Sequence, residues 1–203
     1  MKLLVRPPKL LRRLYKDSVW RLDKTQKKIY LTFDDGPIPQ LTPWVLDVLK
    51  EFKVKATFFC VGENIQKNPE IFNRILLEGH QVGNHTYNHL KGWQTKTRDY
   101  QANVEKCQAL TKTNLFRPPY GRIGRKQYKV LSKSYKIVFW DVLSYDYDKL
   151  TKPVKCLENS IKYTQNGTVI VFHDNLKAES NLKYALPLYI DHFLKLNYTF
   201  VTL

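Results

Sequence analysis

The sequence predicts an α/β protein built as an incomplete (β/α) barrel of about seven parallel strands. From residue 28 onward, short runs rich in β-branched and aromatic residues alternate with segments of helical periodicity. Such strict alternation is typical of parallel strands joined by right-handed crossovers. The chain has 203 residues, whereas a complete eightfold barrel typically needs about 250. An open doubly wound sheet is the structural alternative.

Each element can be placed from its residue pattern. The expected strands cover residues 29–33, 56–61, 80–83, 115–117, 136–140, 168–172 and 199–202. The expected helices cover residues 42–52, 69–78, 97–111, 124–134, 152–164 and 180–196. Pro43 and Pro69 lie near helix starts, where a missing N–H costs little. Gly79 and Gly167 lie just past helix ends, where a left-handed residue is favoured.

The composition is that of a globular protein and excludes several classes. Hydrophobic residues make up 43% of the chain and charged residues 26%, which excludes collagen-like and wholly disordered proteins. No stretch approaches the roughly 18 apolar residues of a spanning helix, so an integral membrane protein is not expected. Cys60, Cys107 and Cys156 are far apart in the sequence, and this odd, scattered set indicates reduced thiols rather than a disulfide framework.

The net charge of +16 is unevenly distributed. Residues 1–28 hold ten Lys and Arg but only two Asp, so half of the excess lies there. We therefore expect a basic N-terminal extension, residues 1–27, followed by a single domain, residues 28–203. Apolar residues recur with helical spacing within 8–22, which predicts an amphipathic helix. The favoured interpretation is a helix packed against the domain, and the alternative is peripheral contact with an anionic membrane surface.

The N-terminus does not resemble a secretory signal, because basic residues interrupt every apolar run. The location is unknown from these observations, with the cytoplasm or the membrane periphery expected. A basic surface can also bind nucleic acid, but no nucleic-acid motif is present, so no specific nucleic-acid partner is expected. The oligomeric state is not predicted.

Polar side chains follow five of the expected strands, at the carboxyl ends where catalytic groups collect in such folds. They are Asp34 and Asp35, His85 and His89, Arg117 and Tyr120, Asp146, and His173 with Asp174. Each has an ordinary structural interpretation: Asp34-Asp35-Gly36-Pro37 resembles a turn, and a single histidine at a strand end is usually structural. The set is far harder to explain by chance.

Two of these groups together suggest a metal site. Adjacent carboxylates at a buried strand end repel unless a cation or an arginine is present. On a helical turn, His85 and His89 would present both imidazoles on one face. A carboxylate with two histidines is a three-ligand set typical of catalytic zinc, with one position left for water.

As a set, four segments resemble the polysaccharide deacetylases, carbohydrate esterase family four, also called the NodB-homology domain. They are residues 32–37 (TFDDGP), 84–89 (NHTYNH), 117–121 (RPPYG) and 169–174 (VIVFHD), in the family's order. The resemblance covers about residues 28–203, and it implies a distorted (β/α) barrel. It also implies removal of N-acetyl groups from amino sugars of the N-acetylglucosamine type, in a polysaccharide, peptidoglycan or a chitooligosaccharide.

The resemblance implies a role for each site residue. Asp35, His85 and His89 would hold Zn²⁺ or another divalent metal such as Co²⁺, Ni²⁺ or Mn²⁺. Asp34 would be the general base for the water held at that metal, and Arg117 would orient Asp34. The backbone N–H of Tyr120 would stabilise the oxyanion. His173 would be the general acid, with Asp146 setting its charge.

One motif departs from the family pattern, which is usually Asp-x-x-Asp-Trp. Leu143 stands in place of the first Asp and Tyr147 in place of the Trp, whereas Asp146 is retained. We expect catalysis to be preserved and the sugar-binding surface to be altered. Two other functions stay open: an O-deacetylase of another acetylated glycan, and a non-catalytic protein that binds anionic polymers.

Overall fold

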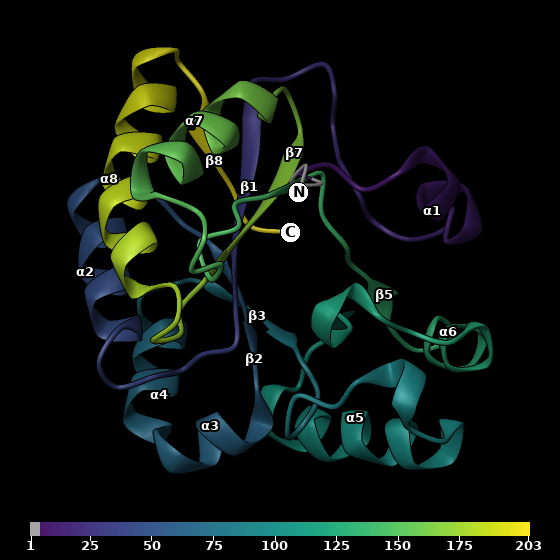
Figure 1. The fold of residues 1–203 in the computed structure, drawn as a ribbon. Helices are drawn as coiled ribbons and strands as arrows, with labels where there is room; N and C mark the ends of the chain where they lie inside the picture. Colours follow the sequence, from purple (N-terminus) through teal and green to yellow (C-terminus); the bar gives the residue numbers. More distant parts are fainter. Residues whose placement is uncertain (1–4) are drawn as a thin grey trace.

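Figure 1 shows the computed structural model of the chain, which describes residues 5–203. One sheet forms the centre of these residues, and all of its strands pair in parallel. Its strands are β1 (Lys28–Asp34), β2 (Thr57–Cys60), β3 (Gln81–Asn84), β4 (Leu115–Phe116), β5 (Lys136–Ile137), β6 (Val142–Leu143), β7 (Thr168–His173) and β8 (Thr199–Phe200). Seven of them follow the order β5-β4-β3-β2-β1-β7-β6, and β8 pairs with the start of β1. The expected incomplete barrel of parallel strands is thereby confirmed.

Helices cover the sheet from outside. They are α1 (Lys9–Leu14), α2 (Thr42–Glu51), α3 (Gly62–Lys67), α4 (Pro69–Leu77), α5 (Thr97–Thr111), α6 (Arg125–Leu131), α7 (Pro153–Tyr163) and α8 (Glu179–Lys195), with 3-10 turns η1 (Gly92–Gln94) and η2 (Pro119–Gly121). Helices α2, α7 and α8 lie together on one side of the molecule, and α5 and α6 lie at the other end of the sheet (Figure 1). The main hydrophobic core lies beneath the first group, and a smaller one is formed by α5, α6 and residues 15–20.

The structure corrects three expectations about elements. The strand expected over 136–140 ends at Ile137, and a further strand, β6, follows at Val142–Leu143. Helix α3 was not expected, because it begins two residues after β2 ends without an intervening turn signal. The helix expected within 8–22 ends at Leu14, because the chain beyond it pairs with other strands.

Residues 15–22 lie along the open side of the barrel, between β5 and β7. Val19 bridges to Val138, just after β5, and Arg21 bridges to Thr168 at the start of β7. Trp20 is buried and stacks on Phe139 with ring centroids 4.3 Å apart. This segment therefore occupies the gap that a seven-stranded path leaves in the barrel.

A buried carboxylate ties the N-terminal segment to the sheet. Asp141 is 1% exposed and accepts a hydrogen bond from Arg12 at 2.7 Å. Arg6 approaches the same carboxylate at 3.5 Å, and the Thr168 hydroxyl donates to it at 3.0 Å. Two of the basic residues of the extension thus neutralise an acidic group of the barrel.

Strand register brings the carboxyl ends of the central strands to one edge. Asp34 on β1 lies opposite His173 on β7 and Phe59 on β2. Cys60 on β2 lies opposite Asn84 on β3, which in turn lies opposite Phe116 on β4. The residues that follow these positions in the sequence therefore emerge at a common rim.

Two other expectations concern the whole chain. Cys60, Cys107 and Cys156 are buried free thiols, in agreement with the scattered spacing of the cysteines. Among residues 5–203, no helix combines the length and apolar character needed to cross a membrane.

Candidate active site

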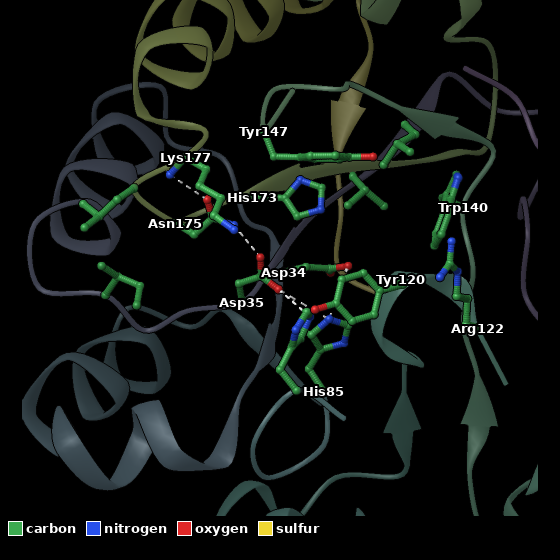
Figure 2. Close-up of a pocket in the computed structure, with 15 residues that line it drawn as sticks. Asp34, Asp35, His85, Tyr120, Arg122, Trp140, Tyr147, His173, Asn175 and Lys177 are labelled. Atoms are coloured by element: carbon green, nitrogen blue, oxygen red, sulfur yellow. Dashed lines mark hydrogen bonds and ion pairs between the residues drawn. The ribbon is translucent and has the colours of Figure 1, made fainter. Parts of the chain in front are cut away.

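A cavity of about 540 Å³ opens at the carboxyl ends of the central strands. Six of the eight site residues expected from the sequence line it, namely Asp34, Asp35, His85, His89, Tyr120 and His173. The other two, Arg117 and Asp146, are fully buried and contact lining residues from behind. Figure 2 shows the carboxylates at the centre of the cavity, with His85 and Tyr120 on one side and His173 and Tyr147 on another.

Asp34 ends β1 and is held by a buried guanidinium. Arg117 donates a hydrogen bond from Nη1 to Asp34 Oδ1 at 2.6 Å and another to Thr32 Oγ1 at 2.8 Å. Arg117 is 0% exposed, and its other nitrogens donate to the carbonyls of Val138 and Phe139. Each of the three guanidinium nitrogens thus donates a hydrogen bond, and the Asp34 carboxylate is held through Oδ1 while Oδ2 is left free of this pairing.

Asp35, His85 and His89 form a compact group in which one ligand atom from each lies within 4.8 Å of the others. Asp35 Oδ1 lies 3.1 Å from His89 Nε2 and 3.6 Å from His85 Nε2. The two histidines do not lie on a helical turn, the arrangement considered for them from their spacing. They lie in a loop after β3, and a left-handed backbone at His89 (φ 58°) turns its ring toward His85.

The protonation of His85 is set by its surroundings. Its Nδ1 lies 2.7 Å from the Arg117 carbonyl, so Nδ1 carries the proton and Nε2 presents a lone pair to the cavity. Burial lowers the pKa of His85 to about 4, which keeps the ring neutral at pH 7. Burial alone would raise the pKa of Asp35, but the hydrogen bond from His89 and the nearby imidazoles hold it below its usual range.

His173 ends β7 and pairs with a buried carboxylate. Its Nδ1 lies 2.8 Å from Asp146 Oδ1, and its backbone N–H donates to Asp146 Oδ2 at 2.6 Å. The two neighbouring acidic residues are engaged elsewhere: Asp141 with Arg12, and Asp148 within its own turn. Burial by itself would lower the pKa of His173, but the Asp146 carboxylate outweighs it and raises the pKa to about 9.

Backbone strain is concentrated in the loops that carry these residues. Asp35 has φ 86° and Tyr120 has φ 60°, both in the left-handed region that residues with a side chain rarely adopt. Thr86, between the two histidines of the cluster, has φ 65°. Such outliers cost about 1–3 kcal/mol each and persist only where surrounding contacts impose them.

Asn175, which the sequence motifs do not single out, supports Asp35 from the loop after β7, and the expected Asp174 supports the neighbouring Gly36. The Asn175 side-chain N–H donates to Asp35 Oδ2, the oxygen that faces away from the histidines. Asn175 Oδ1 accepts backbone N–H groups from Lys177 and Ala178, so the amide cannot turn over. Asp174 accepts the Gly36 N–H at 3.0 Å, and a Cβ at Gly36 would lie 2.0 Å from its carboxylate. Their position directly after His173, at the same rim, was the available signal.

Three aromatic residues near the site, Tyr147, Tyr87 and Trp93, differ in whether they face the cavity. Tyr147 lines the cavity, and its ring meets the His173 ring edge-on, with ring centroids 4.7 Å apart. Leu143 also lines the cavity, so the unusual fourth motif does face the site. The Tyr87 hydroxyl hydrogen-bonds Gln66, and Trp93 lies outside the lining residues, beside Arg122.

Comparison with known proteins is decisive for the family. The family model described as polysaccharide deacetylase matches residues 21–136, which is more than half of the chain. This chain belongs to the polysaccharide deacetylase family. Its fold and the order of its site residues agree with that membership, and the resemblance inferred from four sequence motifs is confirmed.

Individual members of the polysaccharide deacetylase family are similar over most of the chain. A peptidoglycan-N-acetylglucosamine deacetylase of Bacillus cereus is 33% identical, with 90% of this chain and 89% of that protein covered. A chitooligosaccharide deacetylase of Azorhizobium caulinodans is 33% identical over 76% of this chain and 77% of its own length. The crystal structure of a peptidoglycan N-acetylglucosamine deacetylase in complex with an N-oxidanyl-benzamide has a TM-score of 0.88 at 31% identity, covering 97% of this chain and 95% of that one. The protein is therefore an enzyme of the polysaccharide deacetylase class.

Proposed function

We propose that this polysaccharide deacetylase hydrolyses the N-acetyl group of an N-acetylglucosamine-type sugar in peptidoglycan or in a chitooligosaccharide. The observation that carries the proposal is the arrangement of three groups around one cavity. A fixed carboxylate, Asp34, lies beside the Asp35 cluster, and a charged imidazole, His173, lies across from both. Amide hydrolysis needs these three functions: a base, a site that polarises the carbonyl, and an acid for the leaving amine.

The donor set of the cluster fits a divalent metal. Asp35, His85 and His89 would hold it, because they offer one carboxylate and two imidazole nitrogens. The neutral state of His85 and its free Nε2 lone pair are what a metal ligand requires. When bound, an ion such as Zn²⁺ supplies two effects, a lowered pKa of water and polarisation of the acetyl carbonyl.

Asp34 takes the proton from the attacking water in this proposal. Arg117 holds Oδ1, which leaves Oδ2 as the proton acceptor facing the cavity. Because the guanidinium is buried and each of its nitrogens donates a hydrogen bond, the carboxylate keeps one orientation through the reaction. The backbone N–H of Tyr120, in the strained loop on the same rim, would donate to the developing oxyanion.

His173 donates the proton to the departing amine. With Nδ1 bonded to Asp146, its Nε2 carries the transferable proton, and the raised pKa keeps the ring charged at neutral pH. The amine is a poor leaving group without that proton, and carbon–nitrogen cleavage is completed as His173 becomes neutral.

The charge on His173 gives the reaction a predictable alkaline limit. Activity should fall as pH rises through about 9, where the imidazolium of His173 is lost. Asp146→Asn removes the attraction that raises this pKa, so the alkaline limb of the kcat profile should move to lower pH. The pH dependence of acetate release measures the shift. An unchanged alkaline limb in an active Asp146→Asn protein contradicts the pairing, and Asp148→Asn is the matched control.

The amide of Asn175 should contribute to metal affinity. Asn175→Ala removes the hydrogen bond that orients Asp35, so we expect the affinity for Zn²⁺ to fall about 10–100-fold. Calorimetric titration of metal-free protein with Zn²⁺ measures the change directly. Asn114→Ala, at an exposed position before β4, is the control and should leave the affinity unchanged. Equal affinities in the two variants would exclude this role.

The proposed reaction is tested by acetate release from N-acetylglucosamine oligomers and from peptidoglycan. Release should cease after chelation and return when Zn²⁺ is restored. A protein that binds the metal but releases no acetate from any amino sugar would refute the proposal. Release from O-acetylated glycans alone would assign it to the O-deacetylases.

A further inference from the structure

Much of the positive charge in the barrel lies in two stretches that contain no acidic residue. Residues 106–140 hold nine Lys and Arg and no Asp or Glu, and residues 79–98 hold three Lys and Arg and no Asp or Glu. The loops on the His89 side of the cavity, residues 85–95 and 117–124, come from these two stretches. Arg117 already forms an ion pair with Asp34. The basic residues that remain in these two loops are Lys91 and Arg122, and both add positive charge on this side of the site.

Two of these cations lie on exposed aromatic rings. The Arg122 guanidinium lies 5.4 Å from the centre of the Trp93 ring, and Lys91 Nζ lies 5.4 Å from the centre of the Tyr120 ring. Trp93 is 64% exposed and Tyr120 is 52% exposed. Among residues 5–203, neither Lys91 nor Arg122 forms an ion pair with an acidic side chain.

The rings are held in place although they face solvent. Trp93 Nε1 donates to the Ile123 carbonyl at 3.0 Å, which fixes the indole beside Arg122. The Tyr120 ring packs on the His89 ring, with ring centroids 4.6 Å apart. An indole with 64% of its surface in water contributes little to the core, yet its orientation is fixed. Preorganised exposed rings of this kind are suited to receive the apolar face of a sugar.

The two ring–cation pairs, Trp93 with Arg122 and Tyr120 with Lys91, extend the cavity outward. Tyr120 and Arg122 both line the cavity, together with Trp140. Figure 2 shows Arg122 beside Trp140 at one side of the cavity, opposite Asn175 and Lys177. A glycan whose acetyl group reaches Asp34 would therefore pass its neighbouring sugar over Tyr120 and Arg122 toward Trp93.

We propose that Trp93, Arg122, Tyr120 and Lys91 form a subsite for a carboxylate-bearing sugar next to the one that is deacetylated. The proposal rests on the proposed function and narrows its substrate to glycans with free carboxylates on alternate sugars, as in peptidoglycan strands freed of stem peptides. Trp93 and Tyr120 stack on the sugar, and the planar guanidinium of Arg122 donates two parallel hydrogen bonds to the carboxylate. A neutral chitooligosaccharide uses the rings but not the charges.

The test compares two tetrasaccharides: neutral chitotetraose, and a peptidoglycan tetrasaccharide freed of stem peptides, which carries lactyl carboxylates. Arg122→Gln should lower kcat/KM for the acidic glycan at least about 10-fold more than for chitotetraose, because a charge-assisted bidentate pair is lost. Lys129→Gln removes an exposed charge from the same acid-free stretch and should leave the ratio of the two substrates unchanged. Trp93→Ala should lower kcat/KM for both.

Binding to the Asp34→Asn protein separates the subsite from the reaction. Arg122→Gln in that background should weaken binding of the acidic tetrasaccharide about 10-fold or more. Calorimetric titration measures the change in affinity. If the parent protein, with Asp34 intact, deacetylates neither glycan but this loss of binding is seen, the proposed reaction fails and the subsite stands. If both glycans are deacetylated and Arg122→Gln changes them equally, the subsite is refuted. If Lys129→Gln changes the ratio as much as Arg122→Gln, the effect is general charge attraction and the subsite is again refuted.

Discussion

Asp34→Asn should lower kcat for deacetylation by about 10²–10⁴-fold, the usual contribution of a positioned general base. The amide has the shape of the carboxylate and can still accept a hydrogen bond from Arg117 through its oxygen. It cannot take up the proton from water, so the loss falls on the chemical step. Affinity for Zn²⁺ should stay close to that of the parent protein, because Asp34 lies outside the Asp35, His85 and His89 cluster. Initial rates of acetate release and a Zn²⁺ titration on the same sample measure both quantities.

The control is Asp47→Asn, the same substitution at an exposed carboxylate on α2 that pairs with Arg74. It should leave kcat unchanged, because exposed ion pairs contribute little and Asp47 does not line the cavity. Full activity of the Asp34→Asn protein would show that another group is the base. Loss of metal together with activity would instead assign Asp34 to the ligands.

Arg117→Leu should destabilise the protein by about 3–5 kcal/mol, the range found when one partner of a buried ion pair is removed. Asp34 would then be a buried carboxylate without a cation, and the carbonyls of Val138 and Phe139 would lose their donors. Activity should fall with stability, because the carboxylate is no longer oriented. Denaturant unfolding followed by tryptophan fluorescence measures the free energy.

Two further variants separate charge from shape at this position. Arg117→Lys restores a cation, but one ammonium cannot reach the carboxylate and both carbonyls, so it should recover stability only in part. Arg74→Leu, at a half-exposed arginine paired with Asp47 and Glu78, should cost no more than about 1 kcal/mol. A similar small cost for Arg117→Leu would mean that the buried pair does not support the fold.

The candidate site was largely accessible from the sequence because its residues directly follow strands. Asp34 and His173 end strands whose register places them side by side, so their positions in the sequence already determined their neighbourhood. The helix predicted over 97–111 agrees with α5 at both ends, since its pattern is long and continuous. Where a long element or a strand end set the geometry, the local sequence pattern was sufficient to predict the position of the residues.

The remaining features depend on contacts between distant parts of the chain. Strand β6 has only two residues, too few for an alternating pattern. The support that Asn175 gives to Asp35 joins residues 140 positions apart: its position after His173 indicates the rim, but no local pattern indicates the partner. The pairing of Arg122 with Trp93 likewise joins two loops that neither pattern nor motif relates.

The segment that closes the barrel also constrains the order in which the chain folds. Arg12 and its partner Asp141 are 129 positions apart, and Val19 pairs beyond β5. Strand β1 pairs along its length with β7, whose register begins at Ile29 opposite Thr168. During synthesis, β1 can pair early with β2, but its pairing with β7 must wait until residues 168–173 have been made, and Arg12 and Val19 must wait for residues 138–141. Trp20 lacks its stacking partner Phe139 until that part of the chain has been made, so closure of the barrel depends on late, long-range contacts.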